Sequence, residues 1–263
     1  MSKQYLYRVS ILNRKNSHPL EAICYYSGES QYDILNSKNY TSNTVDNVIW
    51  NKILVPSKEE QVSLYKELPE YLKFRSSKKD AMSNARNILW QNVFNREKRD
   101  DAQFSRLFEL SIPAFLSQQE AVNSLNRFAT TLVNEGMIVD CSVHSRQKNL
   151  NNLSLLDRVK ISEKTEKEPE EETSLDYTGY LMCTLRDYKE GRFVNKNREW
   201  NDKKKMETWR AKWVEVLAEL VHNSNLNKDV KESWEEKLTI YSEYEDIRKK
   251  LENKQIHQKV KLT

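Results

Sequence analysis

The sequence contains few of the residues that end or redirect secondary structure, with four glycines and five prolines among 263 residues. Collagen-like chains, linkers and turn-dense all-β folds need many more of both, so these classes are excluded. Three cysteines, none in a CxxC pair, provide neither a zinc motif nor a disulfide framework. No run of 18 apolar residues is present, and the N-terminal segment lacks an apolar signal core. We therefore expect a cytoplasmic protein with no membrane segment.

Charge is abundant but nearly balanced, because 43 Lys and Arg residues face 39 Asp and Glu residues, which leaves a net charge of +4. Much of the acid is concentrated in the segment 161–172 (ISEKTEKEPEEE). Such a run cannot bury enough apolar surface to order itself, so the prediction for residues 145–176 is a mobile loop. This loop would belong to a main domain over residues 1–223, followed by a charged helical extension over residues 224–263.

Four segments alternate apolar and polar residues with the period of two that half-buried strands show, namely 5–13, 104–113, 139–144 and 177–186. Helices are predicted over 18–28, 58–72, 77–103, 118–136, from Asn201 or Asp202 onward, and over 228–256. Ser17 and Ser117 are the expected N-caps of the first and fourth helices. The pattern predicts an α+β fold in which a central antiparallel sheet of about five strands packs helices on one face, followed by a helical C-terminal extension.

The other face of this sheet would be polar and accessible. Its expected members are Arg8, Ser10, Glu109, Ser111, Asp140, Ser142, His144, Thr178 and Tyr180. Tyr25 and Tyr26 lie on the helix directly after the first strand. A tyrosine with an ordinary pKa near 10 attacks poorly unless a base, cations or a metal assist it, so simple packing of both rings is the alternative. His144 alone completes no metal site, and a hydrogen-bonded structural histidine is the alternative there.

Basic residues gather near the second strand and the Trp-rich helix, interleaved with Phe193 and Trp200. Cations beside exposed aromatic rings suit a nucleic-acid groove, where phosphates pair with charge and bases stack. A solvated helix face with ion pairs four residues apart is the alternative explanation.

Taken in order, several segments resemble the MobA/MobL family of relaxases, a branch of the HUH endonucleases, over residues 4–223. They are EAICYYSGE (21–29), VIWNKILVP (48–56), LW (89–90) with EKRDDAQ (97–103), FELSIP (108–113), GMIVD (136–140) leading to His144, and KNREWND (196–202) with Trp209, Arg210 and Trp213. Each segment is weak alone, and their common order carries the resemblance.

The resemblance implies that Tyr25 attacks a phosphodiester at a transfer origin and stays joined to the 5′ phosphate, with Tyr26 where arginine is usual. It also implies a metal held by three histidines. His144 matches the first, whereas Thr178 and Tyr180 stand where the other two belong. Asp140, Glu109 or a loop glutamate could rebuild a hard oxygen site for Mg²⁺ or Mn²⁺.

The partner implied is single-stranded or hairpin DNA, together with other relaxosome or mobile-element proteins. The expected DNA contacts are Arg8, Arg106, Arg198, Lys203 and Arg210. Three functions remain open: a tyrosine relaxase of plasmid mobilisation that nicks DNA, an inactive homologue that serves as a DNA-binding or protein-docking accessory factor, and a replication initiator with the same chemistry.

Overall fold

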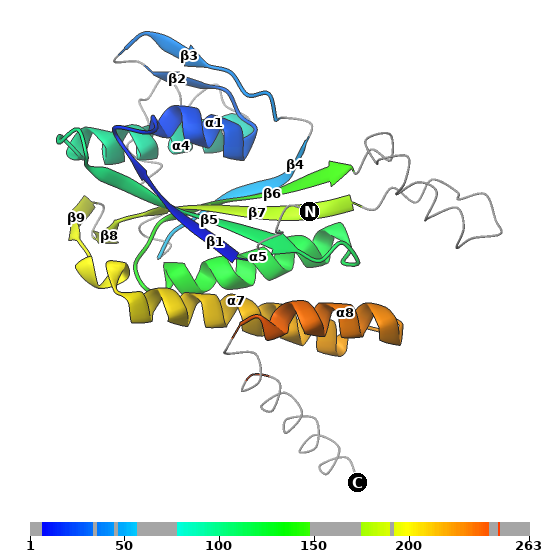
Figure 1. Ribbon diagram of the computed structural model, residues 1–263. Coiled ribbons are helices and arrows are strands. Elements are labelled where there is room, and N and C mark those ends of the chain that lie inside the picture. The colour runs from blue at the N-terminus through cyan, green and yellow to red at the C-terminus, as the bar shows by residue number, and fades with distance from the viewer. Residues whose placement is uncertain are drawn as a thin grey trace.

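The computed structural model describes residues 7–33, 36–44, 47–56, 78–147, 175–189, 192–241 and 247. Its centre is a five-stranded antiparallel sheet in the order β1-β5-β7-β6-β4 (Figure 1). The strands are β1 (Tyr7–Asn13), β4 (Val48–Leu54), β5 (Gln103–Ile112), β6 (Val139–Gln147) and β7 (Leu175–Thr184). The predicted fold class is confirmed, and all four strands predicted from alternation are present.

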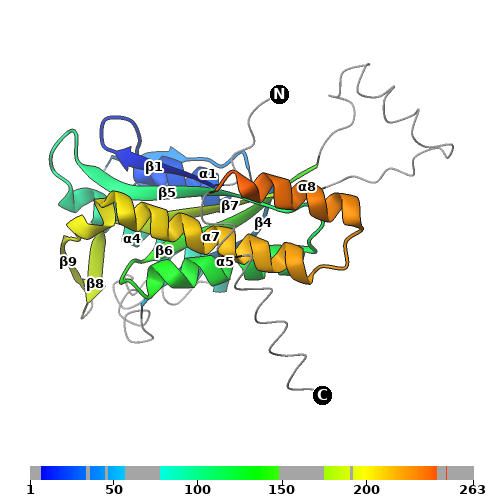
Figure 2. The same cartoon turned by 60° about the horizontal axis from the view of Figure 1, so that its bottom comes forward.

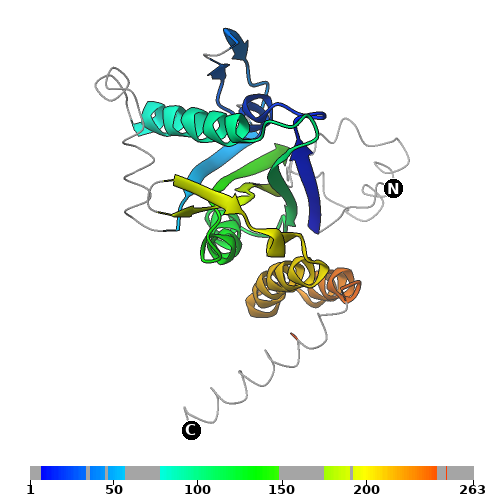
Figure 3. The ribbon, with the colours of Figure 1, turned by 90° about the vertical axis from the view of Figure 1, so that its left-hand side faces the viewer.

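Helices cover both faces of the sheet, so the prediction of one helix-covered face is wrong. On one side lie α1 (Pro19–Ser27) and α4 (Lys78–Arg96), and on the other lie α5 (Gln118–Val133) and α7 (Lys203–Asn223), as Figure 3 shows end-on. The helix α8 (Lys228–Thr239) packs against α7. The polar face predicted to be accessible is therefore partly roofed by α1 and α4, because its buried polar residues need partners that water would otherwise supply.

Two short hairpins and one helical turn complete the described structure. They are β2 (Gln31–Asp33) with β3 (Lys38–Tyr40), β8 (Arg186–Lys189) with β9 (Arg192–Lys196), and the 3₁₀ turn η3 (Arg198–Asn201). Neither hairpin was predicted. The helix predicted over 58–72 and the acidic part of the loop predicted over 145–176 lie outside the described residues, and so does most of the chain after Tyr241.

Local signals explain where the helices begin and end. Ser117 forms the predicted capping box with Glu120 at the start of α5. The predicted cap Ser17 is wrong by one position, because His18 is the N-cap of α1 and its side chain accepts a hydrogen bond from the Leu20 amide. The α4 helix ends at Arg96 rather than near 103, since the chain must turn before β5 begins at Gln103.

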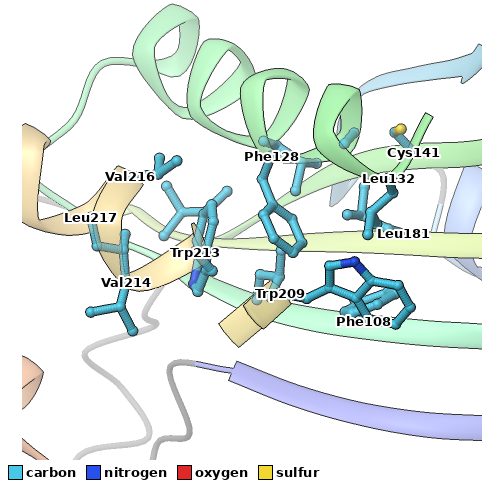
Figure 4. Close-up of a cluster of buried hydrophobic side chains, with 14 of the residues drawn as sticks. Phe108, Phe128, Leu132, Cys141, Leu181, Trp209, Trp213, Val214, Val216 and Leu217 are labelled. Carbon is cyan, nitrogen blue, oxygen red and sulfur yellow. The ribbon is translucent and has the colours of Figure 1, made fainter. Parts of the chain in front are cut away.

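The main core lies between the sheet and the α5–α7 layer (Figure 4). Trp209 and Trp213 of α7 are fully buried there, and each contacts a phenylalanine edge to face, at centroid distances of 5.7 Å to Phe108 and 5.6 Å to Phe128. Leu238 of α8 is buried in the same cluster. The α7 helix ends at Asn223, and the domain boundary expected at that residue stays a prediction. In the described part of the chain no helix is both long enough and apolar enough to cross a membrane.

Candidate active site

The C-terminal end of α1 carries the two tyrosines and is fixed by side chains from three other parts of the chain. A helix leaves its last carbonyl groups without partners of their own. Here three side chains donate hydrogen bonds to these carbonyls: Thr44 to Tyr25 at 2.5 Å, His144 to Tyr26 at 2.7 Å and Asn51 to Ser27 at 2.9 Å. Gly28 follows in the left-handed conformation, with φ of 72°, and turns the chain away from the helix.

Tyr25 is presented to solvent above the β6–β7 part of the sheet. Its side chain is one of the few large hydrophobic ones that are exposed in the described chain, at 38%. The ring centroid lies 6.1 Å from that of His144 and 6.4 Å from that of Tyr180. The structure therefore brings together Tyr25, His144 and Tyr180, which the sequence predictions placed at one site.

Tyr26 belongs to the same aromatic cluster and is half-buried. Its ring packs on Tyr180 at 4.9 Å and on Tyr25 at 5.1 Å. Burial, aided by the charge of Glu109, raises the pKa of Tyr26 to about 12. A phenol with that pKa is almost never ionised at neutral pH, so Tyr26 is the poorer nucleophile of the two residues named from the sequence.

His144 is buried and acts first as a helix-capping donor. Because a carbonyl oxygen can only accept, the Nε2 atom carries the proton in the bond to Tyr26. The ring packs against Tyr180 at a centroid distance of 4.7 Å. A metal bound at Nε2 would have to break the bond that holds the end of α1, which makes the hydrogen-bonded alternative for this residue the arrangement seen.

The two positions where the family resemblance implies further histidines lie next to His144 in the sheet. Thr178 is its direct cross-strand neighbour, and Tyr180 pairs with Ser142 one pleat further along. Tyr180 is buried and its ring fills the space between the two α1 tyrosines and His144. An aromatic ring thus occupies the place of an imidazole ligand, and it supplies packing where a metal site needs a donor.

Asp140 is committed to a buried ion pair and does not face a common metal with His144. Its carboxylate accepts from Nε and Nη2 of Arg86 at 2.9–3.0 Å and from the Trp90 indole at 3.0 Å. Four residues along a strand also separate the two backbones by about 13 Å. This corrects the prediction of Asp140 as a metal ligand, because its oxygens hold α4 against β6 instead.

Arg86 is the centre of a wider buried network that sequence reasoning missed. Its side chain is fully buried and also pairs with Glu29, directly after α1, and with Asn51 of β4. The two carboxylates raise the pKa of Arg86 against the opposing effect of burial. The sequence does carry a sign of this network, because Arg86 lies four residues before Trp90 and so falls on the same helical face as the apolar residues Leu89 and Val93.

These donors do not fit the metal site that the family resemblance implies. Among the described residues, no group of three His, Cys, Asp or Glu side chains is arranged to hold an ion. The carboxylates nearest in the fold are already paired, Asp140 and Glu29 with Arg86, and Glu109 with Arg8. The groups that remain beside His144 are the neutral hydroxyls of Thr178 and Tyr180, which bind divalent cations weakly.

The polar face stays open on the β5–β1 side of the tyrosines. Thr178 is followed across the sheet by Ser111, and Tyr180 is followed by Glu109 and then Arg8. Arg8 and Glu109 form a long pair at 3.7 Å, with side chains 65% and 40% exposed. Exposed pairs of this kind contribute little to stability, so Arg8 can exchange its carboxylate partner for another anion at small cost.

The other predicted DNA contacts are not brought to this strip. Arg106 is 2% exposed and lies on the opposite face, where it bonds the Trp200 carbonyl and the Asn201 side chain. The structure therefore places Arg106 away from the strip beside Tyr25, because its guanidinium is buried on the α7 side of the sheet. Lys203 and Arg210 belong to α7, which packs on the far side of the sheet from α1 (Figure 3). Arg198 is exposed on η3 beside Lys196 and Arg186 of the β8–β9 hairpin.

Comparisons with known proteins agree with this architecture. One solved structure, described as "Molecular Basis of Vancomycin Resistance Transfer in Staphylococcus aureus", superposes with a TM-score of 0.58 at 20% sequence identity, covering 84% of this chain and 94% of that chain. No curated protein matches the sequence. The model of the MobA/MobL family matches residues 20–255, which include α1, the whole sheet after β1, and α4 to α8. The chain therefore belongs to the MobA/MobL family.

Proposed function

We propose that this protein is a relaxase-like protein of plasmid mobilisation that holds a DNA strand on the open polar strip, with Tyr25 at the scissile position. The observation that carries the proposal is the placement of Tyr25, an exposed phenol on a helix end that three side chains hold in place. Pre-organised nucleophiles of this kind reduce the entropy that a transfer reaction must lose. The family membership supplies the class of partner.

The chemistry proposed for Tyr25 is a transesterification. Its phenolic oxygen attacks the phosphorus and forms a phosphotyrosine bond to the 5′ side of the break. The bond from phosphorus to the 3′ oxygen breaks. The phenolic proton is released to solvent, and the leaving 3′ oxygen takes up one proton from solvent to become a hydroxyl, so no net proton is exchanged. In this step Arg8 contributes charge to the phosphate backbone beside Glu109, and the hydroxyls of Ser111 and Thr178 provide neutral hydrogen bonds.

A denaturing-gel adduct assay tests the nucleophile. Labelled single-stranded oligonucleotides of randomised sequence are incubated with the protein in Mg²⁺, in Mn²⁺ and in EDTA. We expect a covalent protein–DNA band that is lost in Tyr25→Phe and retained in the matched control Tyr26→Phe. A band lost only in Tyr26→Phe would assign the attack to the neighbouring residue. The EDTA arm shows whether the reaction needs a metal at all.

A second function, DNA binding without cleavage, is favoured by one specific observation. Two of the three expected histidine positions are Thr178 and Tyr180, and the carboxylate of Asp140 is paired with Arg86. This function predicts no covalent band in any metal condition, but DNA binding that weakens steeply with salt. Arg8→Gln should reduce that binding by about two- to fivefold, whereas Arg127→Gln, on the opposite face, should not. Absence of DNA binding at low salt would contradict both functions.

A further inference from the structure

A cleft opens on the face of the sheet opposite to Tyr25, between the edge strand β1 and the helix α7. Its volume is about 920 Å³, within the range of ligand sites in proteins. The end of α8 lies close to β1 (Figure 2), and Ile240 and Tyr241, which follow this helix, line one side of the cleft. The apolar wall consists of Val9, Ile11, Met206, Ile240 and Tyr241. Ile240 is 76% exposed, which is unusual for an isoleucine of a packed helix end and leaves an apolar surface for another molecule.

Arg106 lines this cleft as a buried cation that has no carboxylate partner in the described part of the chain. Its Nη1 atom donates to the Trp200 carbonyl at 2.6 Å and its Nη2 atom to the Asn201 side chain at 2.7 Å. Its guanidinium also lies 5.4 Å from the Trp209 ring. None of these partners carries a negative charge, and the Nε atom is buried without any hydrogen-bond partner.

The other arginine that is buried among the described residues, Arg86, shows how unusual this is. Arg86 is as deeply buried, yet two carboxylates neutralise it and its pKa is raised. For Arg106, burial lowers the pKa and no acid compensates. Removing a charge from water without a counter-charge is expensive, so a site built in this way is completed by an anion.

A second donor without a partner lies in the same cleft. The hydroxyl of Tyr7, on β1, is buried and makes no hydrogen bond, and burial raises its pKa, so it stays protonated and can donate. Tyr7 and Arg106 are within electrostatic reach of each other, because the charge of Arg106 acts on the Tyr7 phenol. Lys203 and Arg210 also line the cleft, and Glu207 is the single acid among the lining residues.

We propose that this cleft binds a small amphiphilic carboxylate, with its head between the Arg106 Nε atom and the Tyr7 hydroxyl and its apolar body along Val9, Ile11 and Met206. Both residues line the cleft, and each has a polar atom without a hydrogen-bond partner that can serve one oxygen of a carboxylate. The apolar wall contributes binding energy in proportion to the area it covers. The site is independent of the proposed DNA chemistry, because it lies on the other face of the sheet and shares no residue with it.

Titration of the intact protein with decanoate, followed by calorimetry and by the fluorescence of the nearby Trp209, tests this site. Decanol and acetate are the matched probes, since the first lacks the charge and the second lacks the apolar body. We expect decanoate to bind at least about tenfold more tightly than either of them, because both halves of the site are needed. Equal binding of decanoate and decanol would show an apolar groove only and would overturn the proposal.

Two variants assign the head group. Arg106→Gln should weaken decanoate binding by about tenfold or more, and Tyr7→Phe by about fivefold, without changing binding of decanol. Arg99→Gln, an arginine on the exposed turn before β5, is the control and should change nothing. If Arg106→Gln does not fold, Tyr7→Phe decides alone, because it removes one oxygen and keeps the ring in place. Unchanged decanoate affinity in a folded Tyr7→Phe protein, with DNA binding intact, would contradict the assignment.

Discussion

On the α5–α7 face of the sheet, Trp209, Trp213 and Phe128 are fully buried among other apolar side chains, whereas the α1–α4 face is organised around the buried charge of Arg86. The apolar face gains its stability from area removed from water, which depends little on direction. The polar face depends on hydrogen bonds with fixed geometry, and an incomplete set is costly. One sheet therefore separates a largely apolar layer from a layer in which the polar network lies beside a second apolar cluster around Leu20, Leu89 and Trp90.

The difference matters for Tyr25 because its helix is held through the polar network. Glu29 joins Arg86 directly after α1, and His144, Thr44 and Asn51 hold the last carbonyls of that helix. A site that must place one phenolic oxygen within a fraction of an ångström benefits from directional contacts that define a single arrangement. We infer that the polar network was retained at some cost in stability, since ion pairs of this kind rarely stabilise more than an apolar substitute.

Arg86→Met gives the largest expected effect. It leaves Asp140 and Glu29 buried without their cation, so the free energy of unfolding should fall by about 3–5 kcal/mol, measured by urea denaturation. In the double variant Arg86→Met with Asp140→Leu, part of this loss should be recovered, because the more deeply buried of the two unpaired carboxylates is gone. Stability of Arg86→Met within about 1 kcal/mol of wild type would contradict the closed network described above.

The same double variant separates stability from positioning. Glu29 still lacks its partner in that protein, so the end of α1 should be held less well even where the fold is stable. We expect Tyr25-dependent adduct formation, or DNA affinity if no adduct forms, to stay well below wild type after stability has recovered. Full recovery of both properties would show that the network stabilises the fold and has no positioning role.

Much of the sheet was predictable from sequence because alternation reports directly which side chains are buried. β4 escaped this rule, since Val48, Ile49 and Trp50 are consecutive apolar residues and the strand has an irregular register between Val48 and Trp50. The β2–β3 and β8–β9 hairpins have strands of three to five residues, too short for a period to be seen. The second is fixed by distant partners, such as Arg186 to Glu97 at 2.8 Å.

For the site, sequence reasoning grouped residues that lie close together in the fold but did not find their partners. Tyr25, His144 and Tyr180 do meet, through the order of motifs that the family resemblance supplied. The acid on β6 was taken for a metal ligand because its partner, Arg86, lies 54 residues away in the sequence. Which charges neutralise each other in a buried layer depends on tertiary packing, and composition or spacing does not encode it.

Gly179→Ala probes the apolar face and should have an intermediate effect. A Cβ atom at this β7 position would lie 2.5 Å from Leu125 Cδ1 of α5 and 3.3 Å from Ile112 Cδ1. Overpacking of this kind costs about 1–3 kcal/mol, measured as a shift in the urea midpoint. The double variant Gly179→Ala with Leu125→Ala should lose less unfolding free energy than the two single variants lose together, because the truncated side chain leaves room for the new methyl group. Strictly additive losses would argue against close approach of α5 to β7 here.

The smallest effect concerns His18, the cap that anchors the other end of α1. Its Nδ1 atom accepts a hydrogen bond from the Leu20 amide, which requires that this nitrogen be unprotonated. Its ring stacks on the Tyr40 ring with 5.0 Å between the ring centroids. Burial lowers the pKa of His18 below its ordinary 6.5, despite the opposing charges of Asp33 and Glu21, while Lys38 and Arg14 act in the same direction as burial. Below pH 6.5 the unfolded chain therefore binds the proton more readily than the folded one, so this contribution to stability is present above pH 6.5 and is lost as the pH falls.

His18→Asn keeps a good cap without a titrating ring, so its unfolding free energy should vary less than that of wild type between about pH 5 and 7. Parallel pH profiles of the two proteins would show that protonation at the helix cap does not couple to folding, and would leave the polar face sensitive to its ion pairs alone.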